Sequence, residues 1–242
     1  MSKTTFIIGI GNRARQGKDT TASFIKELRK NVYIFHWADA LYEEVKNTDR
    51  QYPLIWRVNI GHDVYYNLLD VPYSRVYRLL KSTEVANIHS LMESRNLTEY
   101  WGMDEKDSPI LQAWGTNFRR QWCDENYWVE KAMSNIQKVL DANFSLNENI
   151  YICVPDTRFH NEEKRLRHIA FAPTEPYRGV FVRVIRLNED DTQYIDPSRN
   201  PNHPSESELE DTKADFTLKA KTGDLESLKQ QTINFLDEID KW

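Results

Sequence analysis

The first part of the chain carries the feature that most limits the fold: an apolar run, then a tight loop, then an amphipathic stretch. Residues Thr5–Ile10 are apolar at almost every position, which is typical of a strand buried on both faces of a sheet. In the stretch Lys18–Lys30, Ala22, Ile25 and Leu28 recur at helical spacing. A strand that enters a helix through a short loop is the first unit of an open α/β fold.

The loop between them carries the pattern of a phosphate-binding loop with two departures. The pattern G-x₄-G-K-[ST] wants a glycine and a hydroxyl where this chain has Asn12 and Asp19. Either Asn12 adopts the positive φ that the glycine would adopt, or the loop begins at Gly11. Thr20 would then supply the hydroxyl for Mg²⁺. The alternative is a glycine turn that binds nothing.

A helix N-terminus presents unpaired N–H groups to an anion, and a lysine in the loop can reach the β- and γ-phosphates. The sequence therefore predicts an ATP site, with Thr20 as its metal ligand. The residues predicted to bind ATP are Arg13, Arg15, Gly17, Lys18, Asp19 and Thr20.

Four further runs are rich in β-branched and aromatic residues and are predicted to be strands. They are Val32–His36, Ile150–Val154, Gly179–Leu187 and Asp215–Leu218. Helical patterns alternate with them, and Asp224 is a predicted N-cap of a last helix. This order predicts an α/β fold with an open sheet.

Two segments interrupt this alternation. Residues 48–109 are aromatic-rich and charged, and we interpret them as a helical insertion without a clear strand, within one domain spanning 1–242. Residues 188–204 are polar, hold three prolines, and are predicted to form a lid loop that carries Arg199. Directly after it, Ser205 and Glu208 have the spacing of a capping box, which leaves His203 and Glu206 unexplained.

Composition excludes some classes of protein. The formal net charge is −5, which disfavours a general nucleic-acid binder and means that an anionic ligand needs a local cluster of positive groups. The two cysteines form no disulfide framework, and Cys153 lies in an apolar run that predicts a buried thiol. No run approaches the ~20 apolar residues that span a bilayer. We expect a cytoplasmic protein that needs no membrane.

Other polar residues follow the predicted strands, where open α/β sheets place their ligands. Asp39 is either a ligand contact or a helix N-cap. Asp156 and Arg158 form either a simple ion pair or a binding site, in which Arg158 holds a phosphate and Asp156 holds a magnesium-bound water or a sugar hydroxyl. Trp128 is either core or a platform for a base. The stretch from Gln112 through Thr116 to Arg119 and Arg120 is either a binding face or a solvated one.

Taken in order, these segments resemble the phage-type deoxynucleoside monophosphate kinases, relatives of the P-loop nucleoside monophosphate kinases. The motifs that carry the resemblance are Arg15-Gln16-Gly17-Lys18-Asp19-Thr20-Thr21, Phe35-His36-Trp37-Ala38-Asp39, Leu111-Gln112 through Gly115-Thr116, Tyr127-Trp128-Val129, Val154-Pro155-Asp156-Thr157-Arg158 with Asn161-Glu162, and His203-Pro204-Ser205-Glu206. Residues 48–109 carry none of them. Asn12 in place of a glycine and Tyr42 in place of a lysine depart from the family pattern.

The resemblance implies a three-layer P-loop fold with five parallel strands, ATP and Mg²⁺ on the loop, and a deoxynucleoside monophosphate in a facing cleft. A homodimer is common in such relatives, and a phage-encoded chain would work in the host cytoplasm. The residues assigned to the monophosphate side are Asp39, Gln112, Thr116, Arg120, Trp128, Asp156, Arg158 and Glu162.

The expected activity is ATP-dependent phosphorylation of deoxynucleoside monophosphates to diphosphates. Catalysis would be electrostatic, with Lys18, Arg15 and Arg158 offsetting the charge of the transferred group, helped by Arg120 or Arg199. Two alternatives stay open. One is a P-loop kinase of another small acceptor, and the other is a non-catalytic regulator that binds a nucleotide.

Overall fold

The computed structural model describes residues 3–42, 55–60, 63–68, 80–81, 113–120, 124–143, 147–168 and 177–242. The chain packs as two compact units. The first unit combines Met1–Trp37 with Ala132–Trp242, and the second is Ala38–Lys131. The second unit contains all of 48–109 and extends beyond it on both sides. No described helix is long and apolar enough to cross a membrane.

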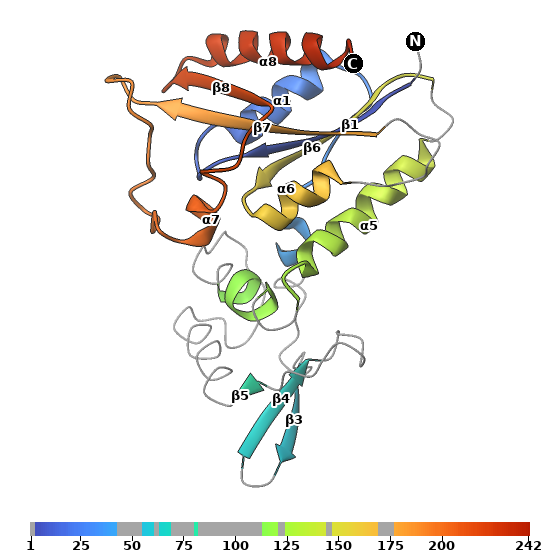
Figure 1. Ribbon diagram of the computed structural model, residues 1–242, viewed down its shortest axis with the longest axis vertical. Coiled ribbons are helices and arrows are strands. Elements are labelled where there is room, and N and C mark those ends of the chain that lie inside the picture. The colour runs from blue at the N-terminus through green and yellow to red at the C-terminus, as the bar shows by residue number, and fades with distance from the viewer. Residues whose placement is uncertain are drawn as a thin grey trace. The chain divides into compact units, whose positions relative to one another are not determined.

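The first unit is built on a five-stranded sheet in which every pair of neighbours is parallel (Figure 1). This confirms the predicted α/β fold with five parallel strands. The strands, in spatial order, are β2 (Val32–Ile34), β6 (Ile150–Thr157), β1 (Thr5–Gly11), β7 (Tyr177–Leu187) and β8 (Phe216–Lys221).

Strand β1 is central because its seven residues are all buried and both of its edges are paired. Ile8 lies opposite Cys153 of β6 on one side and Val180 of β7 on the other. The Cys153 side chain is fully buried, as predicted, and burial raises the pKa of its thiol. Successive apolar residues on β1 can all be buried because helices cover both faces of the sheet.

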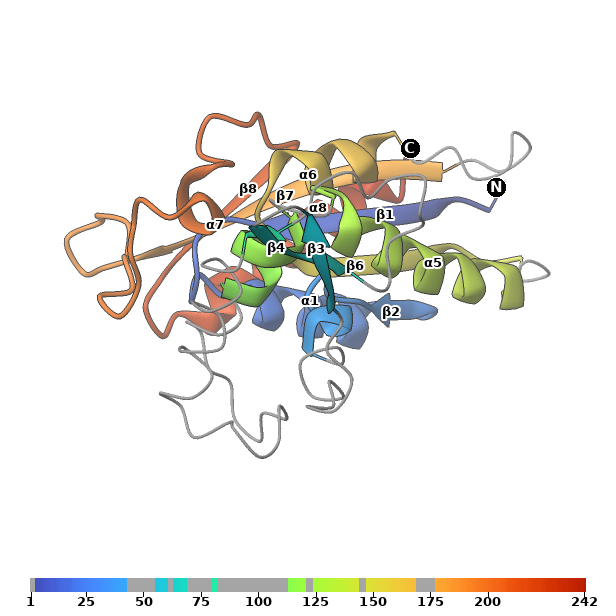
Figure 2. The same ribbon diagram turned by 90° about the horizontal axis from the view of Figure 1, so that it is seen from below.

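Helices α1 (Lys18–Leu28) and α8 (Leu225–Ile239) cover one face and α6 (His160–Arg167) covers the other (Figures 1 and 2). Phe6, Ile8 and Ile10 alternate along β1 and join the core cluster under α1 and α8. On the opposite face, a Cβ at Gly9 would lie 2.2 Å from Leu166 Cδ1 of α6. Glycine at this position therefore lets α6 pack close to the sheet.

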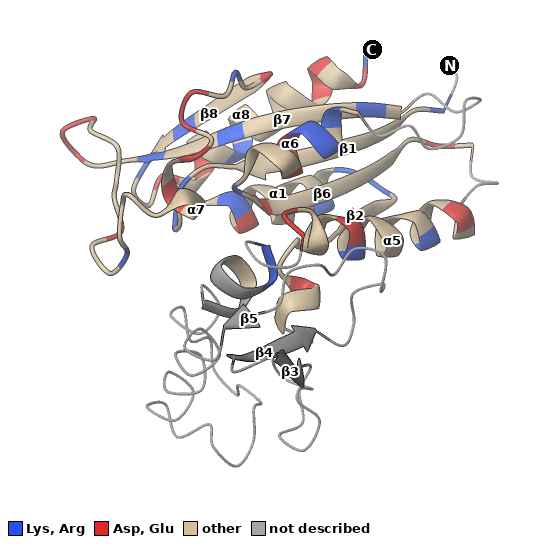
Figure 3. Cartoon of the chain, turned by 60° about the horizontal axis from the view of Figure 1, so that its bottom comes forward, with Lys and Arg blue, Asp and Glu red and all other residues tan. Residues whose placement is uncertain are grey.

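One further prediction on helices can be compared with the structure. Asp224 is the N-cap of α8, and its side chain accepts from the Ser227 N–H at 3.0 Å, as predicted. Helix α5 (Tyr127–Ala142) begins in the second unit and continues into the first. Basic and acidic residues are interspersed along α5 and α6 (Figure 3).

The interpretation of 48–109 as helical without a strand is wrong where the structure describes these residues. An antiparallel sheet in the order β3-β4-β5 occupies this part of the chain. Its strands are β3 (Ile55–Ile60), β4 (Asp63–Leu68) and β5 (Leu80–Lys81). The missed signal is a pair of β-branched and aromatic runs separated by two residues, Gly61-His62, which is hairpin spacing. Nearby, residues Ala113–Arg120 form a π-helical segment, η1.

Candidate functional site

The loop at residues 12–17, which we call loop 12–17, joins β1 to α1 in a backbone conformation that few side chains adopt. Its φ angles are positive at Asn12 (136°), Arg15 (55°) and Gly17 (96°). Gly11 belongs to β1 and is not among the residues with positive φ. Of the two predicted alternatives, the structure therefore supports the one in which Asn12 takes the place of the glycine.

The side chain of Asn12 explains why a residue other than glycine can stand there. Asparagine tolerates positive φ better than most residues. Its amide Nδ2 also donates to the Val184 carbonyl oxygen at 2.8 Å, which joins the loop to β7.

Helix α1 begins at Lys18 without a capping side chain. Its N-cap residue is Gly17 in the left-handed conformation, and no side chain accepts a hydrogen bond from the first turn at that cap. The first N–H groups of a helix have no partner within the helix, and they carry the positive end of its dipole. The first turn of α1 thus offers the donors that an anion requires.

Lys18, the first residue of α1, is a buried charge beside the loop, with 5% of its surface exposed. Its Nζ donates to the carbonyl oxygens of Asn12, at 2.9 Å, and Arg13. Burial, and then the positive charge of Arg158, hold the pKa of Lys18 well below its ordinary value, although Glu206 opposes this shift. A negative ligand beside Lys18 would therefore stabilise its charged form.

The structure brings Arg158 and Asp156 to the same region. Asp156 lies within β6, which continues three residues past the predicted end of this strand. Its Oδ1 accepts from the Trp37 N–H at 2.9 Å. The Nη1 of Arg158 donates to Glu206 Oε1 at 2.9 Å. Both Asp156 and Arg158 are charged groups that act on the pKa of Lys18.

Glu162 was predicted to lie on the monophosphate side of the site. In the structure it has a role in holding the backbone before helix α6. Its Oε2 accepts from the N–H groups of Arg158, at 2.7 Å, and Phe159, at 3.1 Å. These N–H groups precede helix α6, so the carboxylate satisfies donors at the start of this helix. It thereby fixes the backbone that carries Arg158.

The two arginines of the loop form ion pairs with acids from later segments. Arg13 pairs with Glu210, and Arg15 Nε lies 3.0 Å from Asp196 Oδ2. The Arg15 side chain is 66% exposed. Hydrogen bonds from Ser198, and then the charge of Arg15, lower the pKa of Asp196. Both arginines thus join the loop to segments far away in sequence.

The predicted lid, residues 188–204, lies against loop 12–17. Gln16 Nε2 donates to the Tyr194 carbonyl at 2.8 Å, and Gln16 Oε1 accepts from the Arg186 N–H at 2.9 Å. The guanidinium of Arg186 stands 4.2 Å from the centre of the Tyr194 ring. One glutamine therefore joins this segment, the loop and the end of β7.

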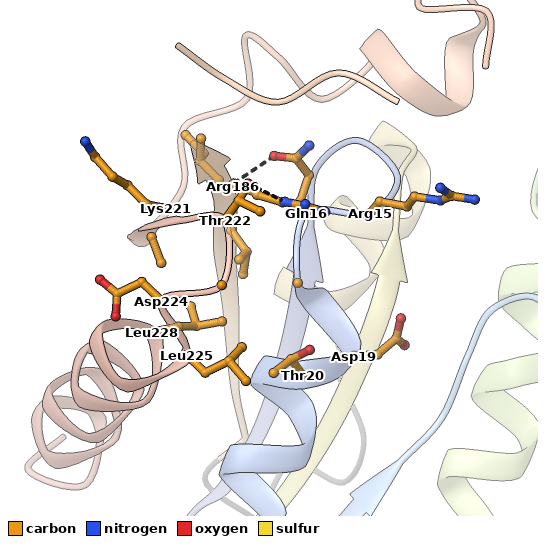
Figure 4. Close-up of a pocket in the computed structure, with 15 residues that line it drawn as sticks. Arg15, Gln16, Asp19, Thr20, Arg186, Lys221, Thr222, Asp224, Leu225 and Leu228 are labelled. Atoms are coloured by element: carbon orange, nitrogen blue, oxygen red, sulfur yellow. Dashed lines mark hydrogen bonds between the residues drawn. The ribbon is translucent and has the colours of Figure 1, made fainter. Parts of the chain in front are cut away.

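A cavity of about 560 Å³ adjoins the loop (Figure 4). This volume falls in the range of small-molecule sites, roughly 300–1,000 Å³. It lies where β1, β7 and β8 end, which is where open α/β sheets bind ligands. The cavity is lined by Arg15, Gln16, Gly17, Asp19, Thr20, Val184, Ile185, Arg186, Ala220, Lys221, Thr222, Gly223, Asp224, Leu225 and Leu228.

Two residues of this cavity have the chemistry to hold Mg²⁺. The predicted ligand Thr20 has a hydroxyl, and Asp19 has a carboxylate whose Oδ1 lies 3.2 Å from His36 Nε2. Mg²⁺ prefers such oxygen ligands and is usually held together with substrate phosphates. Among the described residues, no group of three or more His, Cys, Asp or Glu could hold a metal ion.

The five remaining predicted substrate residues belong to the second unit. Trp128 is buried, and its Nε1 donates to the Gly115 carbonyl at 3.0 Å, which fits the core alternative. Asp39 lies in the first turn of a helical stretch that begins at this residue. Thr116 and Arg120 lie on η1. Gln112 lies outside the described residues, and the roles of all five at a substrate stay predictions.

The predicted capping box at Ser205 and Glu208 is wrong. Helix α7 (Pro204–Ser207) begins two residues earlier than this box predicts, with His203 rather than Ser205 as its N-cap. Its imidazole Nδ1 accepts from the Ser205 N–H at 3.2 Å. Pro204 explains the difference, because proline favours the first helical position and so sets the cap at the residue before it. Glu208 instead accepts from the His160 N–H at 2.9 Å.

Sequence reasoning missed several residues of this region, among them Gln16, Arg186, Glu206 and the turn at Thr222–Gly223. The available signal was position, because the turn follows a predicted strand at the same edge of the sheet as loop 12–17. No protein-family model matches this sequence, and no curated protein sequence is detectably similar to it.

Proposed function

We propose that this protein is an ATP-dependent kinase that transfers the γ-phosphate to a deoxynucleoside monophosphate. The observation that carries the proposal is the buried Lys18 at an uncapped helix N-terminus, which follows a loop with three positive-φ residues and lies beside a cavity of about 560 Å³. Backbone donors, a helix dipole and a buried ammonium together favour a polyphosphate. The choice of a deoxynucleoside monophosphate as the acceptor rests on the resemblance of the ordered motifs to the phage-type kinases.

In this proposal the loop holds the phosphates of ATP, and the adjoining cavity holds its nucleoside. Thr20 and Asp19 line the cavity next to the loop and would hold Mg²⁺, which would neutralise part of the phosphate charge. The apolar side chains of Leu225 and Leu228 and the guanidinium of Arg186 offer surfaces for a planar base.

Transfer to a monophosphate needs no general base, because the acceptor oxygen is already ionised at neutral pH. The residues therefore act by position and charge. The positive charge of Arg158 lowers the pKa of Lys18, so the two groups lie close enough to act on one ligand, and both would face the transferred group. Arg15 lies at the loop and is exposed, so it could turn toward a bound phosphate.

The proposal is tested by ADP release with Mg·ATP and each ribo- and deoxynucleoside monophosphate in turn. We expect turnover with a few deoxynucleoside monophosphates, and a loss of at least ~100-fold in kcat for Lys18→Ala. Lys26→Ala is the matched control, because Lys26 is an exposed lysine in the last turn of the same helix. Near-normal turnover of Lys18→Ala would refute the assignment. Turnover only with an acceptor of another class would keep the kinase assignment but change the proposed acceptor from a deoxynucleoside monophosphate to that class.

A further inference from the structure

A single carboxylate joins loop 12–17 to two arginines from separate segments. Glu206 Oε2 accepts from the Ala14 N–H at 2.8 Å. Glu206 Oε1 accepts from Arg158 Nη1 at 2.9 Å and from Arg199 Nη1 at 3.2 Å. The Glu206 side chain is 4% exposed, and those of Arg158 and Arg199 are 19% and 17% exposed.

The three donors come from parts of the chain that are far apart in sequence. Ala14 belongs to the loop after β1, Arg158 follows β6, and Arg199 belongs to segment 188–204. The backbone of Arg158 is held by Glu162. The Arg199 N–H donates to the Asp196 carbonyl at 3.2 Å, within its own segment. The Glu206 carboxylate is thus the group at which these three parts of the chain meet.

The charges around this carboxylate explain what it does. Two guanidiniums donate to the same oxygen, and like charges so close repel each other unless an anion lies between them. Glu206 also acts on the pKa of Lys18, raising it where Arg158 lowers it. An arginine loses rotamer entropy when its side chain is held in one place. A mostly buried, charge-assisted contact offsets that loss.

We propose that Glu206 is the positioning residue of the phosphate site, and that it holds Arg158 and Arg199 beside loop 12–17 so that both can contact a phosphate group. This inference rests on the proposed function for the identity of the ligand, a nucleotide phosphate. Glu206 itself does not touch the ligand. It acts through the two arginines and through the Ala14 N–H.

The variant Glu206→Gln keeps the shape of the side chain and one acceptor oxygen but removes the charge. Glu206→Asp keeps the charge on a shorter side chain. Glu208→Gln is the matched control, because Glu208 lies two residues away and also accepts a backbone N–H, that of His160, at 2.9 Å. We expect Glu206→Gln to lower kcat by about 10- to 100-fold, because displacement of catalytic groups by about 1 Å has an effect of this size. The kcat of Glu206→Asp should lie between that of Glu206→Gln and that of wild type, and the kcat of Glu208→Gln should be close to wild type.

A second measurement does not depend on turnover. Amide hydrogen exchange of residues 196–206 should become faster in Glu206→Gln, while exchange of β7 stays as in wild type, because the charge that holds Arg199 is gone. Inorganic triphosphate should bind more weakly to this variant. Unchanged exchange, or unchanged turnover and triphosphate affinity, would overturn the proposal. Tighter triphosphate binding would also overturn it, because the carboxylate would then compete with phosphate.

These readouts separate the two proposals. A wild-type protein that transfers no phosphate to any acceptor refutes the kinase. In that case, amide hydrogen exchange and triphosphate binding of Glu206→Gln still test whether Glu206 positions the two arginines. A wild-type protein that is an active kinase, with Glu206→Gln equal to Glu208→Gln in every measurement, refutes only the role of Glu206.

Discussion

Substitution of Asn12 tests the backbone conformation on which the site depends. At a φ of 136°, every side chain other than glycine carries strain of about 1–3 kcal/mol, and asparagine lies toward the low end of that range. The hydrogen bond from Asn12 Nδ2 to the Val184 carbonyl stabilises the native loop by about 1 kcal/mol. Asn12→Gly loses this bond but relieves strain, so its free energy of unfolding should lie within about 1 kcal/mol of wild type.

Asn12→Ala loses the same bond and relieves nothing. Its free energy of unfolding should fall by about 1–3 kcal/mol, which corresponds to roughly 2–12 °C in Tm for a chain of this size. Urea denaturation followed by circular dichroism measures both variants. The reasoning is refuted if Asn12→Ala is as stable as wild type, or if Asn12→Gly is the less stable of the two.

Two further predictions concern protonation. Burial lowers the pKa of Lys18, and a bound polyphosphate would raise it again, so ATP binding at mildly alkaline pH should take up protons. Calorimetry in two buffers of different ionisation enthalpy measures this proton uptake. The variant Lys18→Arg should abolish the uptake. Burial also lowers the pKa of His203 below its ordinary 6.5, so the unfolded chain binds more protons as the pH falls. Stability should therefore be fully present above about pH 6.5 and decline below it, and His203→Asn, which caps without titrating, should show a smaller decline in denaturation midpoint.

The central sheet could be predicted from sequence because its signals are local. The apolar runs at Thr5–Ile10 and Ile150–Val154 bury both faces, and their order along the chain is enough to predict a parallel sheet. The prediction ended strand β6 too early because Asp156 is polar. The observed strand continues past it because strands pair through their backbone, whatever the side chain. The hairpin β3–β4 was missed because a charged, aromatic-rich stretch has no clean alternation.

The site was only partly predictable, since its decisive contacts are not local. Lys18 and Gly17 stand in a recognisable pattern, whereas the contact between Ala14 and Glu206 spans 192 residues. Glu206 could be noticed in the sequence only as an acid that capping does not explain. The N-cap was misplaced by two residues because histidine is a rare cap and the effect of Pro204 was not weighed.

The most direct test of the kinase proposal is to follow the γ-phosphate itself. ATP labelled at the γ-position is mixed with the protein, Mg²⁺ and a deoxynucleoside monophosphate, and the labelled products are separated. The account predicts label in the deoxynucleoside diphosphate, formed at a rate that Lys18→Ala lowers by at least ~100-fold and Lys26→Ala leaves unchanged. Label that stays in ATP, or that appears only as inorganic phosphate with every acceptor, would contradict it.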